Sequence, residues 1–87
     1  MKKVKNWLMI GGEAHGKIIP CFFSRIRYIQ KNNRYVEYTG KTYSYFGKLY
    51  AVAIFNPTDK QLADIPYLIN ELKLSPIEEP PNANHPS

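Results

Sequence analysis

The chain has 87 residues, a formal net charge of +5 and a single cysteine, Cys21. This length supports one small core rather than two domains, and a lone cysteine excludes an internal disulfide. No apolar run approaches the roughly 18 residues that a membrane-spanning helix needs. With 44% hydrophobic and 22% charged residues the composition is that of a folded protein. We therefore expect one domain in the cytoplasm and, because its core is small, a homodimer.

The charge is unevenly spread along the chain. Residues 1–55 carry ten Lys and Arg against two Glu, whereas residues 56–87 carry two Lys against five Asp and Glu. The basic charge therefore lies in the half that is richer in strand-forming residues.

The first half predicts two hairpins. Lys5 to Ile10 is a strand, glycines bracket the turn that follows, and Ile18 to Phe23 is a second strand. Pro20 lacks a ladder donor, which places that second strand at a sheet edge or beside a bulge. Arg25 to Gln30 and Arg34 to Thr39 flank a turn centred on Asn32-Asn33.

The middle of the chain predicts a meander of short strands. The pattern Y-x-G-K-x-Y occurs at Tyr38 to Tyr43 and again seven residues later, and each of its glycines suits a tight turn. Leu49 to Phe55 is apolar throughout, as a central strand covered on both faces is.

A helix is expected after this strand. Thr58 and Gln61 form a capping-box signature that begins it. Pro66 predicts a kink, or a restart capped by Asp64. The predicted buried stripe is Leu62, Ile65, Ile69 and Leu72. Residues 75–87 are Pro-rich and are expected to be a disordered tail, so the predicted domain is residues 1–74.

These elements predict an α+β fold: an antiparallel sheet of about five or six strands with one kinked C-terminal helix on one face. With turns at Asn32-Asn33, Gly40-Lys41 and Gly47-Lys48, alternation sorts the strand residues into two faces. The helix is expected on the face with small alanines, which comprises Ile26, Tyr28, Tyr35, Phe46, Leu49, Ala51, Ala53 and Phe55. The open face would then hold Arg27, Ile29, Lys31, Arg34, Val36, Tyr38, Tyr43, Tyr45, Tyr50, Val52 and Ile54.

The open face is the predicted partner-binding surface. Its candidate residues are Arg27, Lys31, Arg34, Tyr38, Tyr43, Tyr45 and Tyr50. Tyrosines that stack on bases beside cations that contact phosphates are typical of single-strand nucleic-acid binding. The same residue types are hot spots in protein interfaces. Equally, tyrosines are good strand formers that simply cover an open sheet.

Signals for chemistry are weak. Cys21 with His15 as a nearby base could form a thiolate nucleophile. However, Cys21 lies among Pro20, Phe22 and Phe23, which favours a buried inert thiol. Too few ligands are present for zinc, so we predict no metal, no cofactor and no enzyme. The glycine-rich run before Lys17 matches neither common phosphate-loop spacing and is explained by a turn, although an anion site there stays open.

The segment W-L-M-I-G-G-E-A-H-G-K, Trp7 to Lys17, resembles the start of many small tailed-phage and prophage proteins, in which a strand runs through a Gly-Gly-x-x-x-Gly turn into a second strand. Many of those proteins have proline and aspartate where this chain has Glu13 and His15. The resemblance covers the first quarter of the chain and implies a phage accessory protein. That group includes inhibitors of host enzymes and of bacterial defence systems, and the resemblance implies no catalytic residues.

Together these patterns predict a non-enzymatic phage or prophage protein that binds a host macromolecule. A host protein is the expected partner, and nucleic acid is the alternative. The basic charge of residues 1–55 argues against mimicry of DNA.

Overall fold

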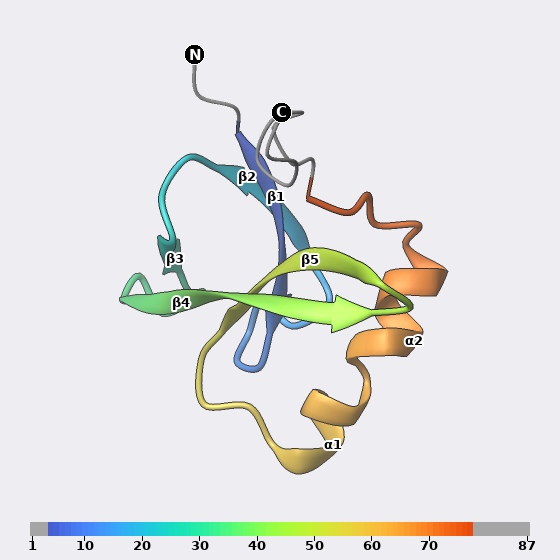
Figure 1. The fold of residues 1–87 in the computed structure, drawn as a ribbon. Helices are drawn as coiled ribbons and strands as arrows, with labels where there is room; N and C mark the ends of the chain where they lie inside the picture. Colours follow the sequence, from blue (N-terminus) through green and yellow to red (C-terminus); the bar gives the residue numbers. More distant parts are fainter. Residues whose placement is uncertain (1–3, 78–87) are drawn as a thin grey trace.

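The computed structural model describes residues 4–77, which form five strands and two short helices (Figure 1). The strands are β1 (Lys5–Ile10), β2 (Ile18–Cys21), β3 (Arg25–Ile29), β4 (Tyr35–Tyr45) and β5 (Lys48–Ile54); the helices are α1 (Asp59–Ala63) and α2 (Ile65–Glu71). The predicted α+β class is confirmed.

The sheet is mixed rather than antiparallel throughout. Its strand order is β2-β1-β5-β4-β3, and β1 pairs with β5 in parallel while every other pair is antiparallel. The prediction of a purely antiparallel meander was therefore wrong. Trp7 to Ile10 and Tyr50 to Ala53 are buried on both faces, and pairing these two strands at the centre removes the most apolar backbone from water. The central position predicted for Leu49 to Phe55 is confirmed.

β4 is one long strand and has no turn at Gly40-Lys41. Gly40 instead allows the Trp7 ring of β1 to pack closely against β4, because a Cβ at this position would lie 2.6 Å from two carbons of that ring. The sheet coils so strongly around this contact that β1 crosses β4 at a steep angle (Figure 1). The turn into β5 is at Phe46-Gly47, one residue earlier than predicted.

The sheet has two buried faces, and the helix covers the one that we expected to be open. We call the two sets the inner face and the helix face. The inner face is Trp7, Met9, Ala14, Ile26, Tyr38, Ala51 and Ala53. The helix face is Leu8, Ile10, Tyr50 and Val52, covered by Ile65, Ile69 and Leu74. The small alanines make room for the Trp7 and Tyr38 rings in the coiled sheet, not for a helix.

The helical region has the predicted start and interruption. The Thr58 hydroxyl accepts a hydrogen bond from the Gln61 N–H at 3.1 Å, and the Gln61 side chain accepts one from the Thr58 N–H at 2.9 Å, so the capping box is confirmed. The helix restarts at Asp64 with Pro66 in the first turn of α2, but the Asp64 side chain makes no capping hydrogen bond, so the predicted cap was wrong. Neither described helix is long and apolar enough to cross a membrane.

The packed chain extends past the predicted boundary at residue 74. Ile77 donates its N–H to the Leu49 carbonyl at 2.7 Å and packs against the inner face. Leu74 and Ile77 thus contribute to opposite sides of the sheet. The rest of the predicted tail, residues 78–87, lies outside the described residues.

Candidate interaction surface

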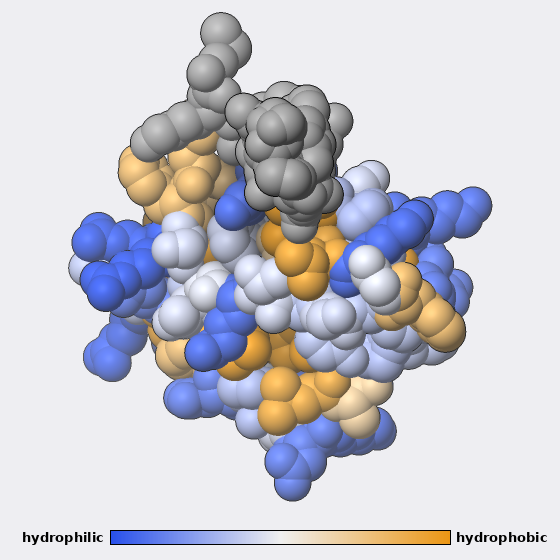
Figure 2. Space-filling view, in the orientation of Figure 1, coloured by the Kyte–Doolittle hydropathy of each residue, from blue (hydrophilic) through white to orange (hydrophobic). Residues whose placement is uncertain are grey.

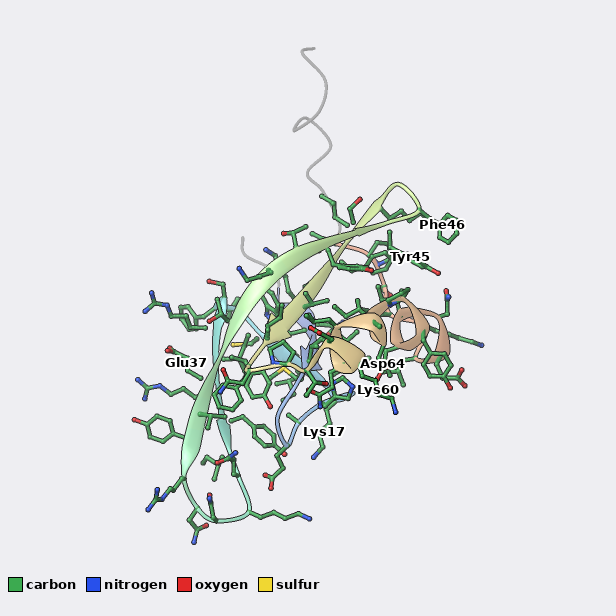
Figure 3. All side chains as sticks on the ribbon, turned by 90° about the horizontal axis from the view of Figure 1, so that it is seen from below. Lys17, Glu37, Tyr45, Phe46, Lys60 and Asp64 are labelled. Atoms are coloured by element: carbon green, nitrogen blue, oxygen red, sulfur yellow. The ribbon has the colours of Figure 1, made fainter. Side chains whose placement is uncertain are left out.

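The outward side of the β3–β4 hairpin is the most distinctive exposed surface among residues 4–77. It consists of the alternate residues that point away from the inner face. We call it the hairpin face, and it comprises Arg25, Arg27, Ile29, Tyr35, Glu37, Thr39 and Lys41. All seven are exposed because α2 covers β1, β5 and only the far end of β4. In Figure 3 the labelled Glu37 points away from the body of the protein.

Cross-strand pairing fixes the geometry of this surface. Arg27 lies opposite Glu37, and Ile29 lies opposite Tyr35. The Arg27 guanidinium carbon sits 5.1 Å from the centre of the Tyr35 ring, a cation–π contact along the diagonal of the ladder. Ile29 and Tyr35 are 70% and 60% exposed, unusually high values for large apolar side chains on a paired strand. The hairpin face therefore presents an apolar centre with an oriented guanidinium beside it.

Positive charge surrounds that centre. The hairpin face holds Arg25, Arg27 and Lys41 against one carboxylate, and the exposed Lys31 and Arg34 follow at the tip of the hairpin. Figure 2 shows hydrophilic residues along the edge of the molecule where Figure 1 places β3 and the β3–β4 hairpin. This arrangement suits an acidic binding partner.

The hairpin backbone is held by local and distant contacts. The turn closes with the Gln30 N–H donating to the Arg34 carbonyl at 2.8 Å, and Asn33 takes a left-handed φ of 69°. Glu13, in the β1–β2 loop, accepts a hydrogen bond from the Lys31 N–H at 2.9 Å. The tip is thus tied to the β1–β2 loop.

The predicted candidate Tyr38 does not belong to this surface. It is fully buried on the inner face, and its hydroxyl donates to the Gly11 carbonyl at 2.7 Å and accepts from the Ala14 N–H at 3.2 Å. Burial raises the pKa of Tyr38. The prediction that Tyr38 is exposed was wrong, and its role is to hold the β1–β2 loop against the sheet.

The other three predicted tyrosines lie beneath α2. Tyr50 is buried, Tyr43 and Tyr45 are half-buried, and all three pack with the helix face. The Asn70 side-chain amide of α2 donates to the Tyr45 hydroxyl at 2.8 Å. The structure therefore separates the predicted tyrosine and cation set: Arg27, Lys31 and Arg34 are exposed, and the tyrosines are structural.

Sequence reasoning missed Tyr35, Arg25 and Lys41 as members of the exposed surface. Tyr35 had been assigned to the covered face because the predicted β3–β4 register was one residue off. A signal was available for Arg25. In the strand Arg25 to Ile29, alternation places Arg25 on the same face as Arg27 and Ile29.

A second cluster lies at the β1–β2 loop, where His15 contacts Asp64. His15 Nε2 is 3.4 Å from an Asp64 carboxylate oxygen, and its Nδ1 accepts a hydrogen bond from the Gly11 N–H at 2.9 Å. A catalytic histidine held by a carboxylate needs its second nitrogen free for a nucleophile. Here that nitrogen is used by the backbone, so the pair joins the loop to the start of α2.

The neighbouring groups are also used in structural contacts. Lys17 donates to the Tyr28 hydroxyl at 3.1 Å, a contact that raises the pKa of Lys17. Cys21 is half-buried and packs against the inner face, and its carbonyl accepts from the Trp7 indole at 3.1 Å. Across residues 4–77, no group of three His, Cys, Asp or Glu side chains is placed to hold a metal ion.

Comparison of the chain with protein-family models, with curated proteins and with solved structures found no significant match.

Proposed function

We propose that this protein is a non-catalytic binding protein that recognises an acidic surface of a host protein through the hairpin face. The observation that supports it most is the exposed stack of Arg27 on Tyr35 beside Ile29. Arginine and tyrosine are the residue types that contribute most to protein interfaces, and an oriented guanidinium loses little freedom on binding a carboxylate.

A protein partner fits this surface better than a nucleic acid does. Stacking on single strands needs several aromatic rings in a row, and Tyr38, Tyr43 and Tyr50 are occupied in the core or beneath α2. The hairpin face keeps one aromatic ring, and its neighbour Ile29 cannot stack with a base. The five cations of the hairpin and its tip favour nucleic acid as the second candidate.

Catalysis is not part of the proposal because the contacts of His15 and Cys21 are structural. The resemblance of the first quarter to small phage proteins makes a bacterial cell the source in which to look for the partner. Blocking a host enzyme or a defence protein requires only a complementary surface, which a domain of this size can supply.

The test is affinity capture from bacterial lysate, with and without nuclease and at low and high salt. Arg27→Glu combined with Ile29→Ser should abolish capture of the partner protein while lowering the thermal midpoint by only a few degrees. Both side chains are exposed, and the main cost is the like-charge pair that Arg27→Glu forms with Glu37. Lys60→Glu on α1 is the matched control for charge reversal and should retain the partner. Recovery of nucleic acid alone, lost at high salt, would replace a protein partner by a nucleic acid.

A further inference from the structure

Phe46 occupies a backbone conformation that disfavours it. It is the first central residue of the β4–β5 turn, and both Phe46 and Gly47 have positive φ, 52° and 74°. Such turns strongly prefer Asn or Gly at this position, because a left-handed conformation crowds the Cβ of other residues. Among the other non-glycine residues of 4–77 with positive φ, Asn33 and Asn56 are of the tolerant type. Lys73 directly follows the C-cap residue of α2, a position where a left-handed residue is common. Local folding therefore does not explain a phenylalanine here.

Burial does not explain it either. Phe46 is 85% exposed, more than any other large hydrophobic side chain of residues 4–77. Its ring packs against the Tyr45 ring in an edge-to-face arrangement with ring centres 4.6 Å apart, and the Tyr45 hydroxyl accepts a hydrogen bond from Asn70. Figure 3 shows Phe46 at the outer tip of the turn, pointing away from the protein. The Phe46 ring is thus exposed while the Tyr45 side chain beneath it is held in place by α2.

We propose that Phe46 is an anchor that inserts into an apolar pocket of a partner protein. Strain at an exposed residue is kept where it serves a function, and a ring on a tight turn loses little freedom when a pocket encloses it. Lys48 lies directly opposite Tyr45 in the ladder and is exposed, so the matching pocket carries a carboxylate at its rim.

This contact is separate from the hairpin face. β4 has 11 residues, and at about 3.3 Å per residue its two ends are roughly 30 Å apart. Tyr35 lies at one end and Phe46 follows the other. A protein pocket is favoured over a lipid surface because a single ring with one nearby lysine lacks the broad apolar face by which proteins bind membranes.

The decisive variant is Phe46→Asn, which removes the ring and supplies a residue that suits the turn. We expect its thermal midpoint to rise by about 4 °C, since a relieved left-handed residue stabilises a domain of this size by that order. The protein captured from bacterial lysate would be identified by mass spectrometry and purified. Its Kd for Phe46→Asn should be about 30-fold weaker than for the unchanged chain.

Three controls make the result decisive. Phe46→Tyr keeps a ring and should retain the partner. Phe23→Asn removes another exposed phenylalanine, 70% exposed in the β2–β3 connection, and should change neither the midpoint nor the Kd. Arg27→Glu reports on the hairpin face separately, so either surface can fail without the other.

The proposal is overturned if no protein is captured through Phe46, or if Phe46→Asn and the unchanged chain bind equally. Equal loss with Phe23→Asn would reveal non-specific adhesion and would also overturn it. Binding to phosphatidylglycerol vesicles that disappears in Phe46→Asn would replace the protein pocket by a lipid surface.

Discussion

Replacing Tyr38 by phenylalanine tests the central packing contact of the domain. The change removes one oxygen and leaves the ring in place against Phe55 and Tyr28, whose ring centres are 5.4 and 6.2 Å away. The lost hydroxyl had donated to the Gly11 carbonyl and accepted from the Ala14 N–H. Both backbone groups are in buried residues and would lose their partner.

The expected cost follows from these two groups. Leaving a buried polar group unsatisfied costs about 1–3 kcal/mol, and the loop can shift to let water reach one of the two. We therefore expect a loss of about 2 kcal/mol, which lowers the thermal midpoint of a domain of this size by roughly 8–16 °C.

The assay is thermal and urea unfolding followed by circular dichroism. Tyr35→Phe is the matched control, because the Tyr35 side chain is 60% exposed and its change should stay within about 0.5 kcal/mol. Hydrogen exchange at the Ala14 amide should accelerate in Tyr38→Phe alone. Equal midpoints for the two variants would refute the assignment of Tyr38 to the inner face.

Burial raises the pKa of Tyr38, so the stability that its neutral form contributes is present below about pH 10 and is lost as the pH rises further, because the unfolded chain ionises first. Urea unfolding from pH 8 to 11 should show a steeper fall for the unchanged chain than for Tyr38→Phe; the contact of Lys17 with Tyr28 acts in the same direction in both. Gly40→Ala should cost about 1–3 kcal/mol by pushing on the Trp7 ring, and adding Trp7→Phe should make the combined loss smaller than the sum in urea unfolding. A chain ending at Leu74 should melt several degrees below one ending at Ile77, because it lacks the hydrogen bond to Leu49 and the packing of Ile77; equal midpoints would contradict that contact.

Local signals in the sequence predicted the elements well. The strands up to residue 29, the capping box at Thr58 and the restart at Asp64 are all confirmed. The grouping of Tyr43, Tyr45 and Tyr50 on one face is also confirmed. Each of these depends on alternation or on contacts within a few residues, which the sequence expresses directly.

The faces were assigned wrongly because of turn geometry. A two-residue turn at Asn32-Asn33 pairs Ile29 with Val36, whereas the observed turn includes Lys31 and pairs Ile29 with Tyr35. A shift of one residue moves every side chain of a strand to the other face. This single shift placed Tyr38 outside and Tyr35 inside. Both turns contain Asn residues, so composition could not distinguish them.

The face of the sheet that the helix covers could not be predicted from the positions of the alanines. Small residues leave space for any large neighbour, and here Trp7 and Tyr38 of the coiled sheet fill it. The same ambiguity applies to Gly40, where the repeat at Tyr38 to Tyr43 predicted a turn. Its φ is not positive; the position is crowded by the Ser24 carbonyl and, most closely, by the Trp7 ring. That contact joins residues 33 apart in the chain, beyond what local patterns record.

The exposure of the hairpin face follows from the lengths of the elements rather than from loose packing. α2 has 7 residues and spans roughly 10 Å, whereas β4 with 11 residues spans roughly 30 Å, so the helix can cover only one end of the strand. The opposite side of the uncovered end is fixed by Ile26 and Tyr38 on the inner face. A surface that is uncovered yet held from behind is pre-organised for the partner that we propose. Substitutions on it should therefore change affinity while leaving stability almost unchanged, which is the behaviour that separates an interface from a core.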